Sequence, residues 1–191
     1  MLSQTLIFLI TTVGDLFALA LLLRFMLQLL RAPARNQLSE FVAALTDFAV
    51  RPARRVIPGM WGLDLATLAL AWLTEAAQIW LVLQFKGYEL GSAVGVALIA
   101  LAALAAIQIV RLAVYVVMFA VVLQAVLSWV NPYSPLAPLL ASVTRPFLRP
   151  FQKLVPPIAN VDLSPLFVLI ICQLVLTVPL AWLDALIGRM L

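Results

Sequence analysis

One segment of this chain occurs twice. The residues from Thr46 to Leu65 recur, without a gap, as the residues from Thr144 to Leu163. Each copy is basic, contains several prolines and leads directly into a long apolar run. The identical positions are Thr46 and Thr144, Arg51 and Arg149, Pro52 and Pro150, Pro58 and Pro156, Asp64 and Asp162, and Leu65 and Leu163. The duplication predicts a protein built from two halves with the same plan.

Hydrophobicity decides the class of fold. Of the 191 residues, 65% are hydrophobic and 10% are charged, whereas about 45–50% of a soluble domain is apolar. A helix that crosses a bilayer needs about 20 apolar residues. The runs that are long enough are Leu6–Leu30, Leu65–Phe85, 92–130 and Leu163–Ile187. The expected fold class is therefore an all-α membrane protein.

Basic residues predict the orientation of these spans. The loop 31–62 carries five arginines against Glu40 and Asp47, and the loop 131–161 carries three basic residues and no acidic one. Positively charged loops stay in the cytoplasm. Both loops should therefore be cytoplasmic, with both termini outside, and an even number of crossings must separate them.

This parity predicts four transmembrane helices in two tandem parallel repeats, each built as span, amphipathic loop and span. Residues 1–86 form the first repeat, 107–191 form the second, and 87–106 form an apolar connector that contains glycine. A single helix over 92–130 would be about 58 Å long, roughly twice the hydrocarbon thickness. We therefore expect a span over 107–130, preceded by an extracytoplasmic or interfacial apolar helix, and a single long helix is the alternative that the sequence leaves open.

The duplicated loops have a helical pattern of their own. Apolar residues recur at helical spacing in both copies, which is typical of a short helix lying in the membrane interface. They are Leu38, Phe41, Val42, Leu45 and Phe48 in the first copy, and Leu136, Leu139, Leu140 and Val143 in the second. Pro52 and Pro150 are expected to end these helices. Asp64 and Asp162 stand where an N-cap belongs, and capping is favoured over a catalytic or ion-binding role.

Five basic residues follow the predicted interfacial helices. They are Arg51, Arg54, Arg55, Arg149 and Lys153. At headgroup depth they act either as topology signals or as a binding site for anionic lipid or a partner protein. The sequence leaves both interpretations open.

Three charged residues lie inside the predicted spans. Asp15 and Glu75 fall near the middle of the first and second spans, and Arg111 lies near the outer end of the third. Ionisable groups in a membrane normally face a partner or water. One interpretation is a structural ion pair of Arg111 with Glu75 or with Asp15. The alternative is a polar path for an ion or proton, lined by Gln78, Gln108, Gln124 and Gln173.

The sequence contains few residues and motifs that are suited to catalysis. The chain has no histidine and one cysteine, Cys172, and it lacks the usual nucleotide-binding, zinc-protease and hydrolase motifs. We therefore predict no catalytic residue, no metal or cofactor site and no direct nucleic-acid binding. The expected partners are the membrane, anionic lipids, other membrane or division proteins, and a further copy of the chain.

Several motifs resemble the YggT (YlmG) family of small integral membrane proteins in its two-copy form. They are Leu21–Leu27, Leu127–Pro135, Arg149–Pro157 and Val161–Pro165. The first copy departs from the pattern at Ala53 and at Ala66 and Thr67. The resemblance implies a bacterial inner-membrane or plastid-membrane location. It also implies links to osmotic-stress tolerance, to cell division and to maturation of membrane cytochromes, and it supplies no catalytic residue.

Two functions follow as hypotheses. The first is a non-enzymatic scaffold or assembly protein of the inner membrane, which uses the two basic loops to bind anionic lipid or partners. The second is a small ion transporter or channel concerned with osmotic or ion homeostasis. A transporter needs a continuous polar pathway, so the surroundings of Asp15, Glu75 and Arg111 discriminate between them.

Overall fold

The computed structural model describes residues 2–33, 36–59, 62–87, 94–131, 133–154 and 162–190. All regular structure in these ranges is helical, which confirms the predicted all-α class. The helices are α1 (Leu2–Leu29), α2 (Gln37–Val56), α3 (Leu65–Phe85), α4 (Val94–Val130), α5 (Ala137–Leu154), α6 (Ser164–Val175) and α7 (Ala181–Ile187).

Four of the helical segments in these ranges are long and apolar enough to cross a membrane, as predicted. They are Ser3–Leu29, Leu65–Phe85, Gly95–Val130 and Ser164–Ile187. The last segment joins α6 to α7 through a π-helical turn, Leu176–Leu180. Pro179 lies in this turn. A proline lacks the N–H that an α-helix needs and crowds the preceding turn, and the wider turn accommodates it without ending the helix.

The predicted break before residue 107 is wrong. A single helix of 37 residues, α4, runs from Val94 to Val130. Beyond Gly95 the segment contains no glycine or proline, and it is rich in alanine and leucine, which form helices readily. Nothing in the local sequence therefore interrupts the backbone hydrogen bonds. A helix this long fits a bilayer by tilting or by extending beyond the hydrocarbon.

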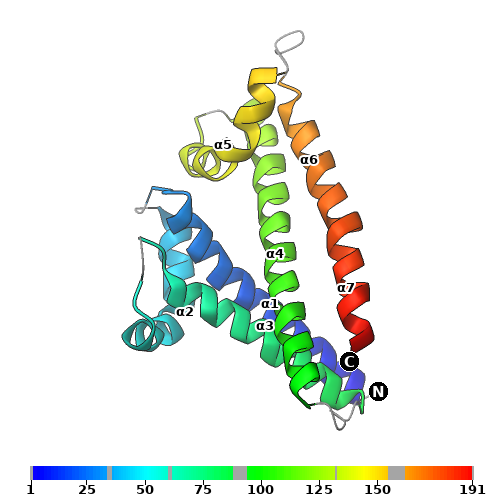
Figure 1. Cartoon of the computed structure of the whole chain (residues 1–191). Coiled ribbons are helices and arrows are strands. Elements are labelled where there is room, and N and C mark those ends of the chain that lie inside the picture. Colours follow the sequence, from blue (N-terminus) through cyan, green and yellow to red (C-terminus); the bar gives the residue numbers. More distant parts are fainter. Residues whose placement is uncertain are drawn as a thin grey trace.

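Figure 1 shows the arrangement of the helices. α1 and α3 run side by side and cross α4 obliquely, while α6 and α7 continue along the other side of α4. α2 and α5 lie outside this bundle, each between two spans in the chain order. The start of α1 and the end of α7 lie at the same end of the molecule, as an even number of crossings requires.

The core connects the two halves. Leu21, Val50 and Val121 are fully buried, and Leu148 is 4% exposed, all in one cluster. Leu21 and Val121 come from α1 and α4, whereas Val50 and Leu148 come from α2 and α5. Lipid tails are as apolar as these side chains, so close packing rather than removal from water stabilises the helix contacts within the membrane.

The loop helices are longer than the sequence indicated. α2 continues through Pro52, and α5 continues through Pro146 and Pro150, so the prediction that Pro52 and Pro150 end these helices is wrong. Each proline removes one helical hydrogen bond and displaces a carbonyl of the preceding turn. All three prolines are exposed.

The side of the membrane on which α2 and α5 lie stays a prediction, and thiol labelling tests it. Single cysteines at Ala44 in α2 and Ala137 in α5, in a Cys172→Ala background, should both be shielded from an impermeant thiol reagent added outside intact cells. Both should react after the membrane is permeabilised, because the excess of arginine and lysine retains these segments in the cytoplasm. Labelling of the two positions from opposite sides would exclude the parallel arrangement.

Candidate functional site

The first loop helix is attached to the first span by an ion-pair cluster. Arg24 of α1 donates through Nη1 to Asp47 Oδ1 and to Thr46 Oγ1 of α2, both at 2.8 Å. Arg51, one turn further along α2, binds the other oxygen of Asp47 at 2.7 Å. The hydrogen bonds from Arg24 and Arg51 hold the pKa of Asp47 below its ordinary value. Arg24 and Arg51 therefore each have an internal partner.

The same helix is attached to the second span through Asp64. As predicted, Asp64 is the N-cap of α3, where its carboxylate accepts from the Thr67 N–H at 3.3 Å. Arg54 of α2 donates to the same carboxylate at 2.5 and 3.2 Å. Asp64 is only 4% exposed. Burial alone would raise the pKa of Asp64, but the hydrogen bonds from Arg54 and Thr67 outweigh it and the pKa is lowered.

The second half makes corresponding contacts through hydrogen bonds in place of ion pairs. Thr144 of α5 contacts the amide of Gln124 of α4. Gln152 donates to Asp162 at 2.9 Å, and Asp162 accepts from the Ser164 N–H at 2.8 Å. The residue at the N-cap position of α6 is Leu163, so Asp162 makes its capping contact from one position earlier. Burial alone would raise the pKa of Asp162, but the hydrogen bonds from Ser164 and Gln152 outweigh this effect and the pKa is lowered.

These contacts give the repeated residues a structural role. Thr46 and Thr144 each bind the preceding span, and Asp64 and Asp162 each bind both the loop helix and the first turn of the following span. Sequence reasoning missed the role of the threonines. The available signal was their identity at the same offset as the two aspartates, at the start of the duplicated segment.

The predicted pairing of Arg111 with Glu75 or Asp15 is wrong. Arg111 instead binds Asp184 of α7 and Gln108, one turn earlier on α4. Sequence reasoning did not single out Asp184. The signal was a second ionisable residue near the end of the last span, at a depth that the long helix α4 also reaches.

The two acidic residues near the middle of the spans have other surroundings. Gln78 of α3 donates to Asp15 of α1 at 2.6 Å. Glu75 is 1% exposed. Neither oxygen of Glu75 has a hydrogen-bond partner within the described ranges, and the same holds for Oε1 of Gln78. A polar cluster therefore lies between α1 and α3, in which Glu75 and Gln78 are buried, and Arg111 is not part of it.

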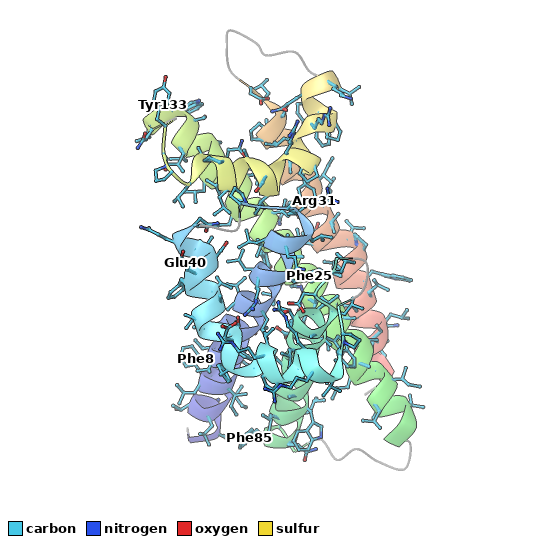
Figure 2. The ribbon with its side chains drawn as sticks, turned by 90° about the vertical axis from the view of Figure 1, so that its left-hand side faces the viewer. Phe8, Phe25, Arg31, Glu40, Phe85 and Tyr133 are labelled. Carbon is cyan, nitrogen blue, oxygen red and sulfur yellow. The ribbon has the colours of Figure 1, made fainter. Side chains whose placement is uncertain are left out.

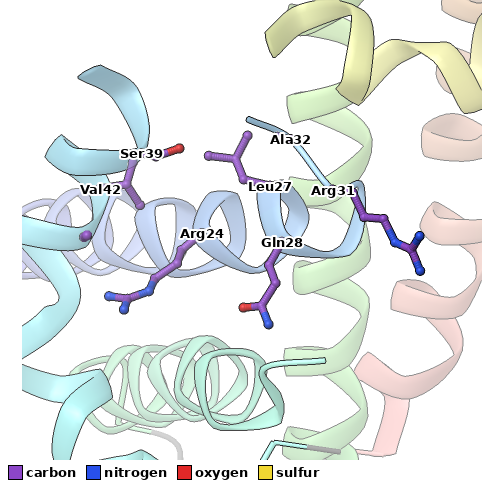
Figure 3. Close-up of a pocket in the computed structure, with 8 residues that line it drawn as sticks. Arg24, Leu27, Gln28, Arg31, Ala32, Ser39 and Val42 are labelled. Atoms are coloured by element: carbon purple, nitrogen blue, oxygen red, sulfur yellow. The ribbon is translucent and has the colours of Figure 1, made fainter. Parts of the chain in front are cut away.

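Two cavities open where α1 ends. The first, of about 420 Å³, lies between α1 and α2 and is lined by Arg24, Gln28, Arg31 and Ser39 among others. Figure 3 shows Arg24 and Gln28 along one side of α1, with the guanidinium of Arg31 pointing away from that of Arg24. Arg31 has a positive φ of 52° at the end of this helix. Arg31 also lines a second cavity, on the side of α5.

The second cavity, of about 540 Å³, joins the two halves of the chain. Its polar lining comes from Arg31 beyond α1 and from Ser142, Arg145 and Arg149 of α5. Figure 2 places Arg31 at the end of α1, beside α5. Within the described ranges, none of these three arginines forms an ion pair with an acidic residue. The cavity therefore collects positive charge that no acidic residue in these ranges neutralises.

The five basic residues singled out from the sequence are thus divided. Arg51 and Arg54 form ion pairs with Asp47 and Asp64. Arg55 and Lys153 are exposed without an acidic partner in the part of the chain that the structure describes, and Arg149 lines the second cavity. Arg31 and Arg145 join Arg149 although the sequence pattern did not select them. In the same ranges, no group of three or more cysteine, aspartate or glutamate side chains could hold a metal ion.

The fold and its charged clusters define a helical membrane protein with four candidate spans and two basic helices outside the bundle. The CCB3/YggT family profile matches residues 3–85 and 103–183. The chain belongs to this family, as the resemblance implied. No solved structure matches the chain significantly.

The matches to related proteins cover almost the whole length of this chain. An uncharacterized protein of Pseudomonas aeruginosa is 38% identical, and the match covers 91% of this chain and 87% of the relative. The uncharacterized protein YggT of Escherichia coli K12 is 31% identical, with 90% of this chain and 87% of the relative covered. An uncharacterized Haemophilus influenzae protein is 32% identical over 89% of this chain and 88% of its own length.

Proposed function

We propose that this protein is a non-enzymatic scaffold or assembly protein of the bacterial inner membrane. In this proposal the chain consists of two tandem parallel repeats, α2 and α5 lie at the cytoplasmic surface, and both termini lie outside. There the basic side chains bind anionic lipid and hold partner proteins at the membrane. The observation that carries the proposal is the cavity lined by Arg31, Arg145 and Arg149, none of which has an acidic partner in the described ranges.

The shape of α2 supports a position in the membrane interface. Val42, Thr46 and Val50 are buried against the bundle. Phe41 and Phe48 are exposed, at 60% and 73%. Charged residues, including Arg51, lie on another side of the helix, away from the buried face. A helix with one apolar face exposed and another side charged is typical of a helix lying at the lipid surface.

Arginine is suited to bind a lipid phosphate. Its planar guanidinium donates two parallel hydrogen bonds to phosphate oxygens, and each basic residue near an anionic surface contributes about 1 kcal/mol. Arg145 and Arg149 form no ion pair with an acidic residue in the described part of the chain, so their guanidinium groups can bind phosphate. Arg51 is already bound to Asp47 at 2.7 Å, so its charge is partly neutralised. The proposal therefore concentrates lipid binding on α5 and the end of α1, rather than equally on both loops.

Loss of two arginines from the cavity tests this proposal. The double variant Arg145→Gln with Arg149→Gln should bind phosphatidylglycerol about 10- to 30-fold more weakly at low salt, because about 2 kcal/mol of attraction is lost. Native mass spectrometry of the delipidated protein in detergent, titrated with this lipid, measures the change. Titration with phosphatidylcholine gives the background that does not depend on lipid charge.

The matched control is Arg51→Gln with Arg55→Gln, which removes the same charge from the other loop helix. It should weaken phosphatidylglycerol binding by less than about threefold, because Arg51 and Arg55 line neither of the two cavities. Equal losses in both double variants would show that total charge, and not the cavity, attracts the lipid. Unchanged binding in both would leave the basic residues as topology signals only.

The partners of such a scaffold are proposed to be other membrane proteins, including division proteins, or a further copy of this chain. Crosslinking in native membranes, followed by mass spectrometry of the captured chains, identifies them. If anchoring at the membrane surface requires the cavity, the double variant at Arg145 and Arg149 should capture fewer of these partners than the double variant at Arg51 and Arg55 does.

A second candidate function is a small ion transporter or channel involved in osmotic or ion homeostasis. The observation that favours it is the polar cluster in which buried Glu75 and Gln78 lie beside Asp15. Ionisable groups at this depth commonly mark a route for ions or protons. Ion-flux measurements on proteoliposomes discriminate between the two functions: a flux abolished by Glu75→Gln supports transport, whereas a scaffold needs no flux.

A further inference from the structure

Glu75 lies in the middle of α3 (Leu65–Phe85) and is 1% exposed. Both of its carboxylate oxygens lack a hydrogen-bond donor within the described ranges. Oε1 of Gln78, one turn further along the same helix, is an acceptor that also has no donor. Three oxygen atoms of these two side chains can therefore accept hydrogen bonds, and none of them has a donor in the described ranges. Burying an ionised carboxylate in this state is very unfavourable.

The charged groups on the surrounding helices do not neutralise Glu75. On α1, Asp15 is the group that interacts electrostatically with it, and its charge has the same sign. On α2, Arg54 is bound to Asp64 at the start of α3. On α4, Arg111 is bound to Asp184. Within the described ranges, no cation therefore compensates a negative charge at Glu75.

The contact between α1 and α3 is built around this cluster. Gly14 of α1 faces Gln78, and a Cβ at this position would lie 1.8 Å from Gln78 Oε1. The neighbouring residue, Asp15, holds the amide nitrogen of Gln78 at 2.6 Å. The glycine leaves room for the amide, and the aspartate fixes it. The Gln78 oxygen is consequently held at a set place one helical turn from the Glu75 carboxyl, on the same side of α3.

We propose that Glu75 carries a proton within the bilayer, and that Asp15, Glu75 and Gln78 together form a proton-binding site between α1 and α3. One proton removes the uncompensated charge of Glu75. It also supplies the O–H donor that the site lacks, and Gln78 Oε1 is the nearby acceptor without a donor. The negative charge of Asp15 favours retention of that proton. This site does not depend on lipid binding at the basic cavity.

A hydrophobic carbodiimide, N,N′-dicyclohexylcarbodiimide, tests the proposal. This reagent partitions into the membrane and reacts with protonated carboxyl groups. The carbodiimide nitrogen takes the carboxyl proton, the carboxylate oxygen adds to the central carbon, and no group leaves. The full chain is reconstituted in phosphatidylcholine vesicles, treated across pH, and analysed by peptide mass spectrometry. Neutral lipid keeps the result independent of the proposed scaffold function.

We expect labelling at Glu75 that declines as the pH rises, with no labelling of Glu40, which is exposed on α2. Asp15→Asn should reduce labelling of Glu75 at least about twofold at the pH of half-maximal reaction, because the charge that favours the proton is lost. Glu75→Gln should abolish labelling of the peptide segment that contains position 75. It should also leave the unfolding equilibrium constant within about threefold of wild type, since a neutral amide resembles the protonated acid.

Three results would overturn the proposal. The first is an absence of labelling at Glu75 at every pH from about 5 to about 9, which would show that its carboxyl does not hold a proton there. The second is protection of Glu75 by sodium but not by potassium ions, which would identify a metal-cation site. The third is a large loss of stability in Glu75→Gln with normal stability in Glu75→Asp, which would show that the negative charge itself is required.

Discussion

Replacing Asp64 with alanine should lower the free energy of unfolding by about 2–4 kcal/mol. The substitution removes the cap of α3, which alone is typically worth about 1 kcal/mol. It also breaks the ion pair that attaches α2 to α3 through Arg54. Arg54 is 46% exposed at its side chain and can turn outward, so the loss should stay below the upper limit for a fully buried pair.

Asp162→Ala is the matched control, because it removes the corresponding residue of the other half. Asp162 is exposed, and its side-chain partner, Gln152, is uncharged. The expected loss is therefore about 1 kcal/mol. Unfolding in mixed micelles, followed by circular dichroism, measures both variants. Equal losses for the two aspartates would show that the Arg54 pair contributes nothing beyond the capping contact.

The same aspartate gives the stability a dependence on pH. Folding lowers the pKa of Asp64 below its ordinary value of 3.8. The folded state therefore binds this proton less readily than the unfolded state does. The stabilisation is complete above the unfolded value and is lost as the pH falls through the folded one. Between neutral pH and pH about 3, the wild type should lose more stability than Asp64→Ala does.

Replacing Arg111 with leucine should destabilise the protein by about 2–3 kcal/mol. The variant leaves Asp184 of α7 without the guanidinium that neutralises it. The side chains of the pair are 26% and 31% exposed in the isolated chain, and in the bilayer part of that exposed surface faces lipid. Ion pairs and hydrogen bonds in membranes contribute less than the low dielectric alone implies, which limits the estimate.

A double-mutant cycle distinguishes a pair from two independent contributions. Asp184→Leu should destabilise about as much as Arg111→Leu, and the double variant should lose less than the sum of the two, because neither charge is then left unpaired. Thermal unfolding in detergent measures all three variants. Arg111→Leu combined with Glu75→Leu serves as the control and should be additive. Additive losses in both double variants would contradict the assigned pair.

Much of the fold was predictable from the sequence because the relevant signals are local. The number of spans follows from the apolar runs together with the parity that the two basic loops set, and α2 follows from the helical spacing of residues such as Leu38 and Leu45. The capping role of Asp64 follows from its place directly before an apolar run. The break proposed within residues 92–130 failed because it was inferred from bilayer thickness, whereas the local sequence favours continuous helix.

The candidate sites depended much more on tertiary structure. Arg31, Arg145 and Arg149 meet at one cavity only because the end of α1 lies beside α5. Sequence spacing shows that Arg145 and Arg149 share a helix face, but it does not bring Arg31 to them. In the same way, the duplicated threonines were visible in the sequence, while their contacts with Arg24 and Gln124 require the loop helix to lie against the preceding span.

The sequence by itself determined the class of protein, the four spans and the family. Hydropathy, charge bias and motif spacing carry that information along the chain, with no need to know which helices touch. Only the tertiary structure decided that Arg111 binds Asp184, and that Glu75 has no hydrogen-bond donor among the described residues. The physical reason is that a membrane span is apolar on nearly every side, so periodicity does not mark the buried face. Helix depth and crossing geometry then select the partner of each charge.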